Sequence, residues 1–118
     1  MSVQQTDLKN EQTRTYSFLV DMYDDDYFPD NLVDKGKDIL VGLCHEIETR
    51  QPKTLEALYA LTHAATDEFN DLQLAFEEQD SEIETVAREC IAADFEFIAI
   101  AYGFDDADAE ELIGTRDW

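Results

Sequence analysis

Basic residues are scarce in this sequence. Eight Lys and Arg stand against 29 Asp and Glu, which gives a formal net charge of -21, and the eight are scattered between Lys9 and Arg116 without a cluster. Nucleic acids and anionic membranes are bound through a basic surface, because their phosphates dominate the interaction. We therefore expect no nucleic-acid and no membrane partner, whereas a basic protein or a cation fits the charge balance.

Long apolar runs and a secretory pattern are also lacking. The longest apolar run, from Phe97 to Phe104, falls far short of the roughly 20 residues that a membrane span requires. The opening stretch MSVQQTDLKNEQTRT has none of the charged-then-apolar design of a signal peptide. These features predict a cytoplasmic protein.

Cysteine is almost absent. Cys44 and Cys90 form no CxxC pair and have no histidine at metal-ligand spacing, and both fall on apolar faces of expected helices. We interpret them as reduced core cysteines. A glycine-rich phosphate loop, a nucleophile elbow and an activated Cys and His pair are missing too. The sequence thus indicates no cofactor and favours a protein without enzymatic activity, although enzyme status stays open.

The chain has only two prolines and four glycines, with no low-complexity segment and no repeat, and its apolar residues recur at helical spacing. Apolar residues make up 44% of the chain, and one core is typically shared over roughly 100 to 150 residues. We expect a polar, flexible lead-in over residues 1–14 and a single helical domain over 15–118. The predicted fold is all-α, a small antiparallel bundle of three long helices and two short ones.

Breakers and caps predict where the first helices lie. A short helix is expected over residues 15–23, and Pro29 then interrupts the pattern. Asp30 can act as the N-cap of a long helix that reaches about Arg50. Gly36 lies within the apolar face of that helix, so we expect another helix or an aromatic ring to approach it closely.

The later helices have clearer signals. Thr54 can cap a helix that extends to about Glu78. Ser81 and Glu84 have capping-box spacing ahead of a third long helix, and Gly103 is placed to end it as the C′ residue. A short final helix is expected in the stretch DADAEELI.

Asp94 lies near the centre of the apolar face of the third long helix. An unpaired ionised carboxylate there would cost several kcal/mol, so Asp94 must hold a proton, accept hydrogen bonds or line a polar cavity. Two interpretations stay open. We favour a structural hydrogen bond, to a tyrosine or to an amide of the first helix. The other is a ligand-binding or catalytic role with Tyr102 or His63 nearby.

A second candidate site lies on the polar face of the helix that follows Thr54. Glu56, His63 and Asp67 recur there at one-turn or two-turn intervals and could hold a metal ion. The more common meaning of such a set is a solvated face with one His and Asp pair. We favour the solvated face.

Four segments carry a resemblance to a known family: MYDDDYFPDNLVDKGKDIL, LYALTHAATDEFNDLQ, SEIETVARECIAADFEFIA and EELIGTRDW. They resemble domain of unknown function 5713, a family of small bacterial proteins, and the similarity extends from about Tyr16 to Trp118. The resemblance implies a bacterial single-domain protein. It carries over no activity and no functional residues.

Two functions from different classes remain open. The favoured one is a non-enzymatic acidic interaction module that binds or inhibits a basic protein. Aromatic residues on its surface would supply the anchors of the interface. The candidates are Tyr23, Tyr27, Phe28 and Trp118. The alternative is a helical protein that binds a small molecule or a metal ion, with or without enzymatic activity, centred on Asp94 and Tyr102. The oligomeric state is not indicated.

Overall fold

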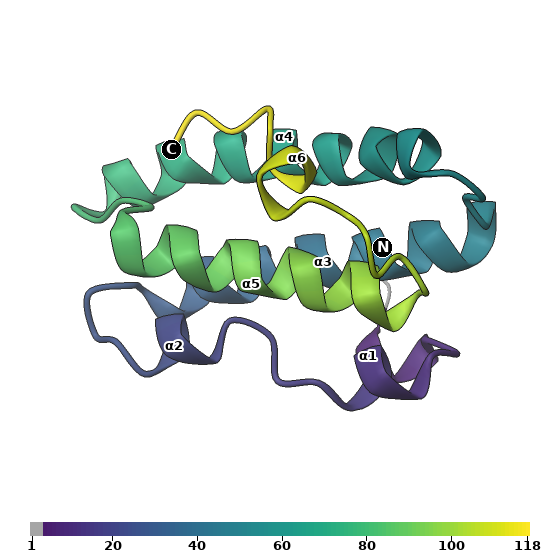
Figure 1. Cartoon of the computed structure of the whole chain (residues 1–118). Coiled ribbons are helices and arrows are strands. Elements are labelled where there is room, and N and C mark those ends of the chain that lie inside the picture. Colours follow the sequence, from purple (N-terminus) through teal and green to yellow (C-terminus); the bar gives the residue numbers. More distant parts are fainter. Residues whose placement is uncertain (1–3) are drawn as a thin grey trace.

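The computed structural model describes residues 4–118, and within them every regular element is helical (Figure 1). The elements in chain order are η1 (Gln5–Asp7), α1 (Glu11–Thr15), α2 (Val20–Tyr23), α3 (Asp30–Arg50), α4 (Leu55–Glu78), α5 (Thr85–Ala101) and α6 (Ala109–Leu112). The predicted all-α fold is confirmed. No helix of the described part is long and apolar enough to cross a membrane.

The three long helices run up and down beside one another, and the short helices pack around them (Figure 1). Helix α3 packs mainly against α4, while α5 packs against α2 and α6. One contiguous core joins α2, α3, α4, α5 and α6, and aromatic rings fill much of it. Its largest fully buried side chains include Phe18, Phe28, Phe69, Phe76 and Phe95.

Gly36 lies where α3 meets its neighbours. A Cβ atom at this position would lie 3.0 Å from the Leu19 side chain and 3.2 Å from the Phe69 ring. The expected close approach of an aromatic ring is therefore confirmed. The missing side chain lets α4 and the segment before α2 close on α3 at the same point.

Local signals predicted some of the helix ends. The Thr54 side chain accepts a hydrogen bond from the Ala57 amide at 3.1 Å, as an N-cap should. At the end of α5, Gly103 has a φ of 92° and the Phe104 amide donates to the Ala99 carbonyl at 2.8 Å. This is a Schellman ending, with the glycine in the left-handed conformation that the motif needs.

Two predicted caps were wrong. Helix α5 begins at Thr85 without a side-chain cap, because the Ser81 hydroxyl donates to the Tyr27 carbonyl at 3.0 Å instead of closing a capping box. Helix α3 has Pro29 at its N-cap position, and Asp30 is its first residue. Asp30 still places a carboxylate in the first turn of α3, where its negative charge interacts favourably with the helix dipole.

The N-terminal part differs most from expectation. The single helix predicted over 15–23 is replaced by α1, an extended link and α2. Of the lead-in expected over residues 1–14, the part from residue 4 contains η1, most of α1 and the buried Leu8, while residues 1–3 lie outside the described part. Both differences arise from carboxylates on α3 and α5 that bind backbone amides of this segment, as described below.

Two glycine variants should change stability in opposite directions. Gly103→Ala places a side chain at a positive φ and should lower the free energy of unfolding by about 1–2 kcal/mol. Gly42→Ala should raise it by about 0.5–1 kcal/mol, because a Cβ there meets no atom within 4 Å and alanine favours a helix. Urea unfolding of both variants measures this. Equal effects of the two changes would contradict the Schellman ending.

Candidate functional site

Asp94 is almost fully buried, with 4% of its surface exposed, and both of its carboxylate oxygens are used. Oδ2 accepts a hydrogen bond from the Leu19 amide at 2.7 Å, and Oδ1 accepts one from the Tyr16 hydroxyl at 2.9 Å. Leu19 has a left-handed conformation, with a φ of 58°, which is unfavourable for a branched side chain. Asp94 therefore holds a strained turn of the segment before α2.

Tyr16 covers this carboxylate from outside. Its ring stacks on Phe97 with centroids 3.8 Å apart and meets Phe18 edge to face at 4.9 Å. Burial raises the pKa of Tyr16 to about 12, with the hydrogen bond to Asp94 adding to the rise. Tyr16 is thus a neutral donor at physiological pH.

Burial also raises the pKa of Asp94, while the hydrogen bonds from Leu19 and Tyr16 oppose that rise. Since both oxygens already accept bonds from the protein, neither is presented to a ligand in this structure. The geometry is that of a structural tie between α5 and the N-terminal segment.

Glu48 on α3 is a second such carboxylate, and sequence reasoning missed it. It accepts hydrogen bonds from the backbone amides of Lys9, at 2.9 and 3.1 Å, and Asn10, at 3.0 Å. The Tyr102 hydroxyl donates to Glu48 at 2.5 Å and lies 3.1 Å from the Thr13 hydroxyl. Tyr102 therefore belongs to the Glu48 cluster and not to Asp94. No local pattern could have predicted it, because the amides lie 38 or 39 residues away.

The pKa of Glu48 is set by opposing effects. Burial alone would raise it, but the hydrogen bonds from Tyr102, Lys9 and Asn10 outweigh burial and lower it overall. Burial raises the pKa of Tyr102, and the bond to Glu48 raises it further. The pair is therefore an ionised carboxylate and a neutral phenol, which suits a structural clamp.

The polar face of α4 is not simply solvated, because the C-terminal segment lies along it. His63 Nε2 lies 2.7 Å from the Glu111 carbonyl. The Asn70 side chain donates to the Thr115 carbonyl at 3.0 Å and accepts from the Asp117 amide at 2.8 Å. Nε2, one of the two imidazole nitrogens that could bind a metal, is thus engaged by the backbone.

The proposed metal ligands are not brought together as a cluster. Glu56 and Asp67 are exposed, and His63 turns to the C-terminal segment. Within residues 4–118 no group of three or more His, Cys, Asp or Glu side chains could hold a metal ion. The geometry gives the metal hypothesis no support.

Cys44 and Cys90 are free and buried, in line with their interpretation as core residues. Burial is the main cause that raises the pKa of the Cys44 thiol to about 12 and that of Cys90 to about 11. Both thiols are therefore protonated and poorly nucleophilic at neutral pH.

The aromatic residues expected at the surface differ in exposure. Tyr27 is 41% exposed, whereas Phe28 is 1% exposed and is therefore not a surface anchor in this structure. The Tyr23 hydroxyl donates to Asp34 at 2.5 Å, and Trp118 packs edge to face on Phe69. Phe28 is buried because it meets the Phe76 ring at right angles inside the core.

Two loops meet at one end of the bundle, at the left of Figure 1. Residues 24–28 precede α3, and residues 77–84 comprise the end of α4 and the link to α5. The bond from Ser81 to the Tyr27 carbonyl ties the two stretches together. We name this surface the acidic end. Its carboxylates are Asp24, Asp25, Asp26, Glu77, Glu78, Asp80, Glu82 and Glu84. Neither stretch contains a Lys, Arg or His, so the exposed Tyr27 shares this end with carboxylates that have no basic neighbour in either stretch.

A family model described as a family of unknown function, DUF5713, matches residues 12–118. The chain belongs to this family. No curated protein and no solved structure matches the chain. The part that matches DUF5713 includes Asp94 with both of its partners and the whole acidic end, whereas η1 and the amides bound by Glu48 lie before it.

Breaking the Asp94 tie should destabilise the fold. Asp94→Ala leaves the buried Leu19 amide without a partner and should lower the free energy of unfolding by about 2–4 kcal/mol, and Tyr16→Phe should lower it by about 1–2 kcal/mol. Glu96→Ala is the matched control, because Glu96 is an exposed carboxylate of the same helix. Denaturant titration measures all three. A loss below about 0.5 kcal/mol for Asp94→Ala would rule out the tie.

The contributions of Glu48 and Asp94 to the stability of the fold should depend on pH in opposite directions. The pKa of Glu48 is lowered by folding, so its stabilising effect is present above the unfolded pKa, near 4.3, and is lost as the pH falls. The pKa of Asp94 is raised, so its protonation stabilises the fold on acidification. From about pH 7 to about pH 3, wild type should lose stability relative to Glu48→Gln and gain it relative to Asp94→Asn. Parallel curves would contradict these assignments.

Proposed function

We propose that this protein is a non-enzymatic acidic interaction module that binds a basic protein through its acidic end. The observation that supports this most is the convergence of two carboxylate-rich loops around an exposed aromatic ring. Interfaces take specificity and fast association from complementary charge, and much of their affinity from a few aromatic anchors. The acidic end offers both.

Most of the acidic side chains of the protein face solvent. Of the 29 acidic residues, all but Asp25, Glu48 and Asp94 are exposed. Two ion pairs form among the described residues, Arg50 with Glu46 at 2.6 Å and Arg116 with Glu110 at 3.2 Å. Most carboxylates thus remain without a basic partner inside the protein, so the field that reaches a basic protein is strong.

Tyr27 is well placed as an anchor. Its ring meets the buried Phe28 ring edge to face at 5.1 Å, and its carbonyl is held by Ser81. A side chain that is already held loses less conformational freedom when a partner binds. Two further apolar side chains are exposed on the helices that meet at this end. Leu74, in the last turns of α4, is 60% exposed, and Val86, in the first turn of α5, is 43% exposed.

We further propose that the protein acts in the bacterial cytoplasm. Two buried free thiols suit a reducing compartment, in which disulfides are rare. The alternative centred on Asp94 lacks a supporting observation, because the protein itself occupies both oxygens of that carboxylate.

The acidic end can be tested by a charge-matched pair of variants. One carries Asp24→Asn, Asp26→Asn, Glu78→Gln and Asp80→Asn. The control carries Glu11→Gln, Glu56→Gln, Asp105→Asn and Asp106→Asn, which neutralise exposed carboxylates in α1, in the first turn of α4 and in the link from α5 to α6. These three segments lie at the other end of the bundle (Figure 1). Immobilised wild type should retain a basic protein from a lysate of its source cells and release it with salt. The acidic-end variant should bind that purified partner at least about tenfold more weakly, and the control within about threefold of wild type.

Tyr27→Ala separates the anchor from the charge. It should weaken binding by about tenfold or more without changing the salt dependence, because the carboxylates remain. Retention of no basic protein, or an equal loss in both charge variants, would overturn the proposal.

A further inference from the structure

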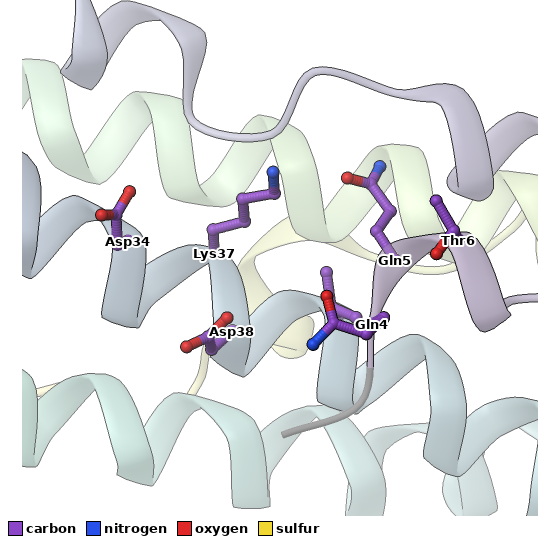
Figure 2. Close-up of a pocket in the computed structure, with 7 residues that line it drawn as sticks. Gln4, Gln5, Thr6, Asp34, Lys37 and Asp38 are labelled. Carbon is purple, nitrogen blue, oxygen red and sulfur yellow. The ribbon is translucent and has the colours of Figure 1, made fainter. Parts of the chain in front are cut away.

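Two pockets adjoin on the side of the molecule where the N-terminal segment crosses α3. One has a volume of about 340 Å³ and is lined by residues of η1 and α3 (Figure 2). The other has a volume of about 390 Å³ and is lined by residues 14–18, α2 and α3. Gln5 and Lys37 line both, so the two pockets are neighbours, and we name them together the N-terminal groove. Its size lies in the range of small-molecule sites.

The groove is lined by both acidic and basic side chains. Asp34 and Asp38 of α3 line the first pocket, and Arg14 lines the second. Lys37 lines both pockets, and its ammonium group extends toward the chain segment between α1 and α2 (Figure 2). Within residues 4–118 neither Arg14 nor Lys37 forms an ion pair, and Arg14 makes only a long bond of 3.4 Å to the Leu8 carbonyl. Both cations thus line the groove without an ion-pair partner in this part of the chain.

The walls of the groove are held in place. The side-chain amide nitrogen of Gln5, Nε2, donates to the backbone carbonyls of Thr13, at 2.9 Å, and Tyr16, at 2.6 Å. Tyr23 donates to Asp34, and Tyr16 is held by Asp94. The two tyrosine rings and the ends of both pockets are thus positioned without a ligand, which reduces the cost of binding one.

We propose that the N-terminal groove binds a small zwitterion, an amino acid or short peptide with an apolar side chain. Its carboxylate would meet Arg14 and Lys37, its ammonium group would meet Asp34 and Asp38, and its side chain would lie against the tyrosine rings. A simple anion is disfavoured by the net charge of -21, and a simple cation would be repelled by Arg14 and Lys37. A zwitterion satisfies both the acidic and the basic side chains of the groove without net charge.

The probe for this proposal is the dipeptide glycyl-phenylalanine, added to the full chain and followed by amide chemical shifts and by calorimetry. Its methyl ester lacks the carboxylate, and its N-acetyl form lacks the ammonium group. Each analogue should bind at least about tenfold more weakly than the dipeptide, because one set of charged contacts is lost. The shifts should map to residues of the N-terminal groove.

Lys37→Gln and Asp38→Asn should each weaken binding of the dipeptide by about tenfold. The matched controls are Lys35→Gln and Asp71→Asn, which remove charges from a different pocket between α3 and α4 and should leave binding unchanged. Circular dichroism confirms that the variants fold. Absence of shifts at millimolar dipeptide, equal binding of the analogues, or an equal effect of the controls would overturn the proposal.

Discussion

The rest of the structure depends on the two hydrogen bonds that Asp94 accepts. They hold Leu19 in a left-handed conformation and direct Tyr16 onto Phe97. Leu19 can then fill the space above Gly36, where a side chain would collide with it. The chain direction before α2, the closure of α3 on its neighbours and one wall of the N-terminal groove all follow from this one buried carboxylate.

The protein uses its carboxylates in two different ways. Asp94 and Glu48 turn inward and bind backbone amides of the N-terminal segment, while nearly all the others face solvent. Outward carboxylates repel one another and oppose the compact state. The inward pair counteracts this by satisfying amides that a short, broken set of helices leaves without intrahelical partners. An acidic surface and an ordered N-terminal segment are thereby compatible in one small domain.

Much of the fold could be predicted because its signals are local. The long helices have clear apolar periodicity, Thr54 lies three residues before the amide it caps, and Gly103 directly follows the end of α5. The N-terminal segment could not be predicted, because its shape is determined by Asp94, 75 residues from Leu19, and by Glu48. The role of Ser81 could not be predicted for the same reason. Its hydroxyl bonds to the distant Tyr27 carbonyl and not to an amide of the following helix. The sequence favoured a buried hydrogen bond for Asp94 over a ligand-binding role, but its partners required the structure.

The C-terminal segment carries a feature of practical use. Trp118 is the single tryptophan of the chain, and its ring packs edge to face on Phe69, a buried residue of α4. Its fluorescence therefore reports one event, the docking of the last residues along α4, without interference from other indoles. Emission from Trp118 and the far-ultraviolet signal of the long helices would separate undocking of this segment from unfolding of the bundle.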